Sequence, residues 1–218
     1  MAWDMKVLPD NHFIFAFVPL SGGKINIKQP LFKIFITDKD LKIVNKFFNY
    51  EEKDYEFIGK RTYFSSMGDG VIFSSMGSDD FSFFYGADSI RSIAVDIEDR
   101  IPDKYRRNQK EIEETGYSYI AQTPICCINY IAFEFRSGDN LISYVYAEDK
   151  ERFLANPNIT SFNYFLYPNA SYQNKFFCYL DDYSLYKELV DTGFERANSV
   201  VERHLLDEGA ILLIYTMY

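Results

Sequence analysis

The feature that most constrains the fold is the grouping of short apolar runs into sets of four. The first set is Met5–Leu8, Phe13–Val18, Leu31–Thr37 and Leu41–Phe48, and the second is Thr62–Met67, Val71–Met76, Phe81–Tyr85 and Ile90–Ile97. Aromatic and β-branched runs bounded by turn residues predict strands. Even strand spacing fits a sandwich or a barrel as well. Four antiparallel strands recurring every ~40–50 residues are typical of β-propeller blades, so the grouping favours a propeller.

Two further sets are less regular. The third set is Tyr119–Asn129, interrupted by Pro124, then Tyr130–Arg136, Leu141–Tyr146 and an irregular or edge run, Phe153–Phe162. The fourth set is Tyr164–Tyr167, Phe176–Leu180 and Ala210–Tyr215, and it lacks a fourth strand. We therefore predict an all-β fold of three four-stranded antiparallel blades and an incomplete fourth. The predicted blades cover residues 4–49, 61–98, 117–162 and 163–218, in a single β-propeller region over 1–218.

The word FSSMG occurs twice, at residues 64–68 and 73–77. It does not predict a phosphate-binding loop, because GxGxxG is absent and neither copy leads directly into a helix. The spacing instead predicts a hairpin whose strands, 62–67 and 71–76, flank the turn Gly68–Gly70. Similarly, FKIFITDKDLKIV and FSFFYGADSIRSI align as one type of hairpin with an Asp-containing turn.

Two helices interrupt the strands. The segment 102–115 begins with Pro-Asp, contains strong helix formers and precedes Gly116, which predicts a helix inserted at the surface. Its basic cluster, Lys104, Arg106 and Arg107, fits a solvated helix face. The segment 185–206 carries an apolar stripe and is predicted to be a second helix, packed on the sheets.

Composition narrows the classes of partner. Among the 218 residues, 21 Phe and 18 Tyr suit half-buried strands. A formal net charge of -9, with scattered basic residues, argues against nucleic acid as a partner. The sequence contains no run of about 18 apolar residues, and its first residues do not read as an export signal.

The cysteines and histidines predict structural roles. The cysteines lack metal-ligand spacing and are expected to be buried: Cys126, Cys127 and Cys178. The sequence does not decide whether Cys126 or Cys127 forms a disulfide with Cys178. His12 is predicted in a turn, and His204 near the end of a helix, where the helix dipole favours a cation.

No catalytic constellation is predicted. The acidic pairs Asp79-Asp80 and Asp181-Asp182, and the group Asp96, Glu98 and Asp99, could bind calcium, but adjacent acids are more often turn residues. A calcium-loop motif is absent, and the serines lie outside any GxSxG context. We predict no catalytic residue, no metal ligand and no resident cofactor, with calcium as the alternative.

The densest aromatic stretch, residues 162–179, predicts a binding loop at Tyr167–Tyr172. Exposed tyrosines on loops serve carbohydrate or peptide binding. The candidate ligand-binding residues are Tyr167, Asn169, Tyr172, Asp181 and Asp182.

The order of several stretches carries a resemblance over nearly the whole chain: LPDNHFIFAF, LFKIFITDKDLKIVNKFF, DGVIFSSMGSDDFSFFYGADSIRSIAVDI, IPDKYRRN and LLDEGAILLIYTMY. It resembles the carboxy-terminal part of six-bladed β-propeller proteins of Bacteroides-type bacteria. The resemblance implies a family related to NHL-type propellers, mostly uncharacterised, exported and often lipid-anchored. The chain departs from this pattern in having no lipobox cysteine and fewer blades.

These departures lead to an expectation about completeness. We expect a fragment or truncated form of a longer protein, because an open ring would expose strand edges. The alternatives are a closed four-bladed ring and self-association through open blade edges.

Two functions fit these patterns. The first is a non-catalytic binding or scaffold propeller of the cell envelope or periplasm, with an unknown carbohydrate, peptide or protein as ligand. The alternative is a lactonase-like, calcium-dependent propeller hydrolase.

Overall fold

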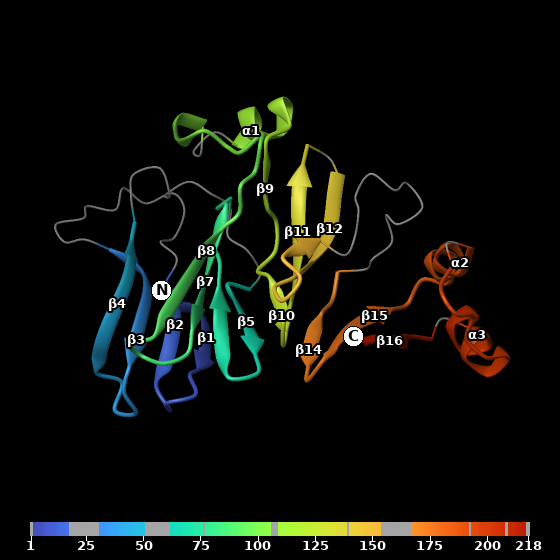
Figure 1. Ribbon diagram of the computed structural model, residues 1–218, viewed down its shortest axis with the longest axis horizontal. Coiled ribbons are helices and arrows are strands. Elements are labelled where there is room, and N and C mark those ends of the chain that lie inside the picture. The colour runs from blue at the N-terminus through green and yellow to red at the C-terminus, as the bar shows by residue number, and fades with distance from the viewer. Residues whose placement is uncertain are drawn as a thin grey trace. The chain divides into compact units, whose positions relative to one another are not determined.

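The described strands form four antiparallel sheets, which confirms the all-β prediction (Figure 1). The computed structural model describes residues 2–17, 31–50, 62–75, 77–105, 109–138, 140–153, 167–191, 193–207 and 209–216. Two compact units divide the chain: Met1–Pro124 with Glu134–Ile142, and Ile125–Phe133 with Ser143–Tyr218. The interpretation of the sheets as blades of one propeller region stays a prediction.

The first sheet has the strand order β1-β2-β3-β4. Its strands are β1 (Ala2–Val7), β2 (Phe13–Phe17), β3 (Phe32–Thr37) and β4 (Ile43–Asn49). Along β2, buried Ile14 and Ala16 alternate with half-buried phenylalanines, as period-two side chains require. The predicted Asp turn joins β3 to β4, where Asp38 Oδ1 accepts the N–H groups of Asp40 and Lys42, both at 2.9 Å.

The second sheet has the order β5-β6-β7-β8. Its strands are β5 (Phe64–Met67), β6 (Gly70–Phe73), β7 (Asp80–Phe84) and β8 (Ile90–Ala94). The FSSMG hairpin is confirmed, but Gly70 pairs with Met67, so the turn is only Gly68-Asp69. The second FSSMG does not continue as a strand beyond Phe73, although the Ser74 N–H still donates to the Tyr63 carbonyl at 3.3 Å, in the register of the β5–β6 pair.

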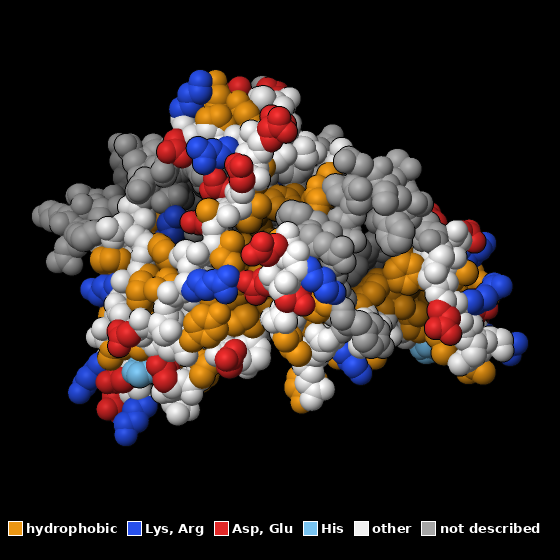
Figure 2. Space-filling model, viewed as in Figure 1, with side chains coloured by type: hydrophobic (Ala, Val, Ile, Leu, Met, Phe, Trp, Pro, Cys, Tyr) orange, Lys and Arg blue, Asp and Glu red, His pale blue; other side chains and the backbone are white. Residues whose placement is uncertain are grey.

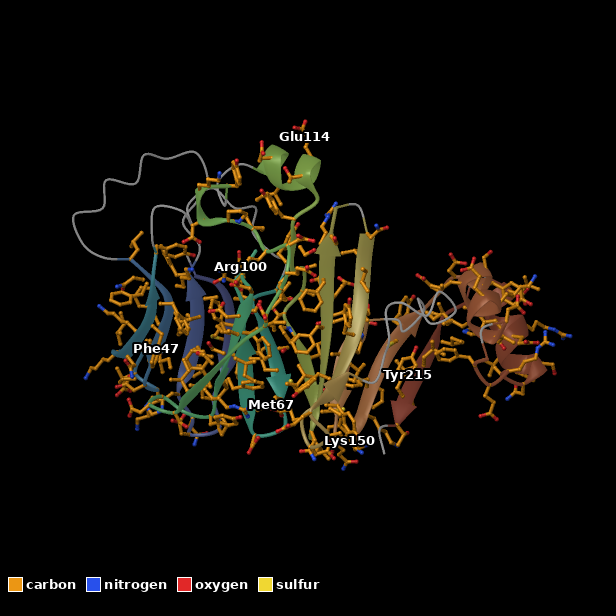
Figure 3. All side chains as sticks on the ribbon, turned by 45° about the horizontal axis from the view of Figure 1, so that its top comes forward. Phe47, Met67, Arg100, Glu114, Lys150 and Tyr215 are labelled. Carbon is orange, nitrogen blue, oxygen red and sulfur yellow. The ribbon has the colours of Figure 1, made fainter. Side chains whose placement is uncertain are left out.

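An apolar core joins these two sheets within the first unit. It contains Ile14, Ile34 and Ile36 from one sheet and Val71, Phe73 and Phe84 from the other. The ring of Phe47, labelled on β4 in Figure 3, meets Phe84 edge-on at 5.4 Å between centroids. Asp4 Oδ2 adds a polar link by accepting the N–H groups of Tyr63 and Phe64 at 2.9 and 3.0 Å.

The third sheet has five strands rather than the predicted four. They are β9 (Ser118–Ile120), β10 (Ile125–Cys127), β11 (Tyr130–Ser137), β12 (Asn140–Ala147) and β13 (Arg152–Phe153). The run 119–129 is split at Pro124, which lacks the N–H that a ladder needs, and β9 and β10 pair with different ends of β11. Residues 154–162 of the predicted last run lie outside the described residues.

The fourth sheet has three strands in the order β14-β15-β16. They are β14 (Ala170–Tyr172), β15 (Lys175–Leu180) and β16 (Ile211–Thr216). The prediction of a loop over Tyr167–Tyr172 is wrong for its second half, because β14 pairs there with β15. Residues 164–166 of the predicted first strand lie outside the described residues, and Tyr167 itself is not in a strand.

The helices also differ from their predictions. A 3-10 turn (Asp103–Tyr105) precedes α1 (Gln109–Thr115), and Ile112 is buried with Ile101 and Tyr119, so the segment does more than lie on the surface. Arg106 and Arg107 lie outside the described residues. A single helix over 185–206 is wrong. The chain forms α2 (Tyr183–Asp191) and α3 (Ser199–Leu206), separated at Gly193, whose φ of 108° is incompatible with a continuous helix.

Candidate binding surface on the last sheet

The face of sheet β14–β16 that points away from its core carries mostly apolar and aromatic side chains, together with the exposed Lys175 and Thr216 in line with Tyr172. Strand register defines this face: Phe177 lies opposite Ala170 on one side and Ile214 on the other, and Tyr179 lies opposite Leu212. Directly opposed residues of antiparallel strands point to the same side of the sheet. We call the five residues Tyr172, Phe177, Tyr179, Leu212 and Ile214 the outer surface of this sheet.

The outer surface is open to solvent. Exposed fractions are 68% for Tyr172, 58% for Tyr179, 58% for Leu212 and 52% for Ile214. Hydrophobic side chains gather over the β15 and β16 region in Figure 2. Single exposed apolar residues are common, but a contiguous group that combines tyrosine rings with aliphatic side chains is characteristic of an interaction surface.

The opposite face of the same sheet is firmly packed. Phe176, Cys178 and Leu180 alternate along β15 and are fully buried. Phe176 packs with Ile125, Val145 and neighbours, and Leu180 packs with α2 and α3. The Ser171 hydroxyl donates to the Cys126 carbonyl, which ties β14 to the same core. The outer surface is therefore carried by a sheet that is fixed from behind.

A polar network holds the two helices that support β15 and β16. The buried Tyr186 hydroxyl donates to Glu202 Oε1 at 2.9 Å and accepts the Ala197 N–H at 2.9 Å. The Arg196 guanidinium donates to the same Glu202 oxygen at 2.7 Å. Hydrogen bonds from Arg196, and then from Tyr186, lower the pKa of Glu202. Burial and the contact with Glu202 raise the pKa of Tyr186 despite the hydrogen bond from Ala197.

The five candidate residues from sequence fall into different environments. Tyr172 belongs to the outer surface, whereas Tyr167 packs against the core behind the sheet. Asn169 is exposed, but its side chain is used to extend β14: Oδ1 accepts the Tyr179 N–H at 2.7 Å. Asp182 caps α2 by accepting the N–H groups of Ser184 and Leu185. Asp181 is exposed beside it.

Four residues of the outer surface are not among the candidates from sequence. Phe177 and Tyr179 read as core strand residues, and Leu212 and Ile214 lie in an uninterrupted apolar run. Only the pairing of β15 with both β14 and β16 places them on one face with Tyr172. Half-buried and exposed residues alternate along β16. Because both kinds of position are apolar, the sequence does not reveal this alternation.

The three cysteines are free and buried, so no bridge to Cys178 forms. Burial raises the pKa of Cys127 and of Cys178 to about 12, which keeps both as unreactive thiols at neutral pH. Their roles are therefore those of small core residues, as the sequence predicts.

Other polar residues with chemical potential have structural partners. Asp79 pairs with Arg100 at 3.4 Å, and the Ser65 hydroxyl donates to the Pro124 carbonyl. His12 lies in the β1–β2 turn beside Asp10, and His204 lies in the last turn of α3, as the sequence predicts. Among the described residues, no three His, Cys, Asp or Glu side chains gather as a metal site. In the same part of the chain, no helix is long and apolar enough to span a bilayer.

Comparison with known proteins gives a likeness in fold. No family model matches the chain, and no curated protein matches it in sequence. A crystal structure of a predicted exported protein from Bacteroides fragilis aligns with a TM-score of 0.71 at 14% sequence identity. The alignment covers 98% of this chain and 65% of that protein, so the chain spans about two thirds of the longer molecule. At this identity the match shows a shared fold.

Proposed function

We propose that this chain is the binding part of a non-catalytic protein of the bacterial cell envelope, and that the outer surface of sheet β14–β16 contacts a peptide or protein ligand. The observation that carries the proposal is that Tyr172, Tyr179 and Leu212 are exposed on one face of a sheet, with Tyr172 at one end and the directly opposed Tyr179 and Leu212 towards the other. Tyrosine supplies a large contact area at low conformational cost, which is why binding surfaces use it.

The chemistry of the surface favours a peptide or protein over a sugar. Leu212 and Ile214 present aliphatic groups that cannot form hydrogen bonds. They contribute favourably to binding only when an apolar partner covers them. A sugar ring would stack on Tyr172 or Tyr179 but would leave these aliphatic groups in water. An extended peptide with apolar residues at alternate positions matches the spacing of a sheet face.

Three carboxylates that have structural partners support the non-catalytic part of the proposal. Asp182 caps a helix, Asp79 pairs with Arg100, and Glu202 pairs with Arg196. Groups held in this way serve the fold. A catalytic acid or base instead needs a free position facing a substrate.

Two observations support the proposed location in the cell envelope and the proposed arrangement of the sheets as blades. The protein from Bacteroides fragilis that shares the fold is named as a predicted exported protein. The grouping of strands into successive antiparallel sheets fits propeller blades.

The test is a binding screen on two sources of ligand. Fluorescently labelled chain is applied to an array of short synthetic peptides and to a glycan array, and the dissociation constants of the retained probes are measured by anisotropy. We expect retained peptides with alternating apolar residues. Tyr172→Ser with Tyr179→Ser should weaken their binding by about tenfold or more.

The matched control is Ile43→Ser, which removes an exposed aliphatic side chain from the edge of a different sheet. This control should bind as the wild type does. Peptide binding that the tyrosine variant leaves unchanged would overturn the assignment of the surface, and retention of glycans alone would overturn the ligand class. Turnover of a lactone or glycoside library by the wild type would overturn the non-catalytic proposal.

A further inference from the structure

The outer edge of β16 is open in the described part of the chain. β16 pairs along its whole length with β15, from Ile211 opposite Leu180 to Thr216 opposite Lys175. Among the described strands it has no second neighbour. An edge of this length presents a row of backbone N–H and C=O groups that can pair with another strand.

The sequence of β16, ILLIYT, carries no charge, no proline and no glycine. Other edges are charged or short: β1 carries Asp4 and Lys6, β4 carries Lys46 and β8 carries Arg91, while the uncharged β9 and β14 have only three residues each. The uncharged β5 edge lies next to Asp4, whose carboxylate accepts the Phe64 N–H. The β16 edge has no such protection among the described residues.

Burial along β16 is also incomplete. In β15, the three side chains that face the core are fully buried. In β16, Ile211, Leu213 and Tyr215 face the same core and are only half-buried. Tyr215 is labelled in Figure 3. A strand added beside β16 would complete the burial of Ile211 and Leu213.

From these observations we propose that β16 pairs antiparallel with β16 of a second copy of the chain, about a two-fold axis at Leu213. An antiparallel self-pairing places each residue opposite a residue of the same strand, and β16 has no charge that could oppose a like charge. The pairing joins two three-stranded sheets and leaves neither β16 with an open edge. It uses the edge of β16 and does not rest on the proposed ligand.

The register follows from the faces of the strand. Directly opposed residues must point to the same side, so exposed residues pair with exposed ones and core-facing residues with core-facing ones. An axis at Leu213 sets Leu212 opposite the second copy's Ile214 and Ile211 opposite its Tyr215. An axis at Ile214 would set Leu212 opposite a threonine and bury less apolar surface, so the axis at Leu213 is favoured.

Sedimentation equilibrium of the full chain and of three variants tests the pairing. The wild type should have twice the 25.6 kDa mass of one chain. Leu212→Lys and Ile214→Glu should each sediment as monomers with unchanged circular dichroism, because each places a charge in the paired edge. The control Val200→Lys, at a position 76% exposed on α3, should remain a dimer.

An equimolar mixture of the Leu212→Lys and Ile214→Glu chains tests the register. Lysine of one chain would then lie opposite glutamate of the other, and the mixture should recover the dimer. A monomeric wild type, a wild type larger than a dimer, or a dimer that Leu212→Lys leaves intact would overturn the proposal. Failure of the mixture to recover a dimer would overturn the axis at Leu213.

Discussion

Asp10 Oδ2 accepts the Ala87 N–H at 2.7 Å, and this bond ties the β1–β2 turn to the β7–β8 turn of the neighbouring sheet. Asn45 on β4 adds a second link, donating to the Ala87 carbonyl at 3.1 Å and to Asp88 at 3.0 Å. Gly86 allows the close approach, because a Cβ added there would lie 2.6 Å from Asp10 Oδ2. The two turns are therefore held together by hydrogen bonds that depend on the small size of Gly86.

A double-mutant cycle measures this fit. Gly86→Ala should destabilise the wild type by about 1 kcal/mol or more, because the new methyl group displaces the Asp10 carboxylate. In the Asp10→Ala protein the same change should cost much less, giving a coupling of about 1 kcal/mol between the two sites. Urea unfolding of the four proteins supplies the values. Strictly additive costs would show that the two residues do not interact.

The stability that Asp10 contributes should depend on pH. Burial alone would raise the pKa of Asp10, but hydrogen bonds from Ala87 and His12 outweigh it and lower the pKa. A carboxyl with a lowered folded pKa stabilises the protein above its unfolded pKa of about 3.9, and that stability is lost as the pH falls. Asp10→Asn should therefore be less stable than the wild type at pH 7, and the difference should shrink toward pH 3. Unfolding curves at both pH values check this, and a constant difference would contradict it.

Tyr186→Phe tests the network between α2 and α3. The change leaves the Ala197 N–H without its acceptor and removes a donor from Glu202, so a loss of about 1 kcal/mol is expected. Tyr183→Phe is the matched control, since the Tyr183 hydroxyl has no hydrogen bond among the described residues. Thermal unfolding compares the two variants. Equal effects would show that the Tyr186 hydroxyl does not stabilise the helices.

Thiol titration tests the three cysteines. The native chain should react very slowly with a thiol reagent at neutral pH, because all three side chains are buried and those of Cys127 and Cys178 have pKa values of about 12. The unfolded chain, kept free of reductant, should yield three thiols per chain. A yield of one thiol would reveal a disulfide, and fast reaction of the native chain would show that the core around β10 and β15 is open.

The sequence predicts the strands well where apolar alternation and local turns determine them. The FSSMG hairpin and the Asp38 turn are examples, because their hydrogen bonds join residues close in the chain. Proline at 124 also signals correctly that the run 119–129 is interrupted. Local rules fail at the second helix, where Gly193 breaks a stretch whose apolar stripe reads as continuous.

The candidate surface is predicted only in part, for a physical reason. Tyr172 is predicted from its loop-like neighbours but lies in strand β14, and the side chains of Asn169 and Asp182 support the backbone. Leu212 and Ile214 lie in an all-apolar strand, a pattern typical of strands buried on both faces. Which face is covered depends on what packs there, and that is decided by segments distant in sequence.

Hydroxyl-radical footprinting of the tyrosines, with and without the peptide that the array selects, tests whether the outer surface of sheet β14–β16 is the binding surface. We expect Tyr172 and Tyr179 to be oxidised readily in the free chain and protected in the complex, while buried Tyr186 reacts little in both. Protection of tyrosines elsewhere, with Tyr172 and Tyr179 unchanged, would contradict the claim that the outer surface of sheet β14–β16 is the binding surface.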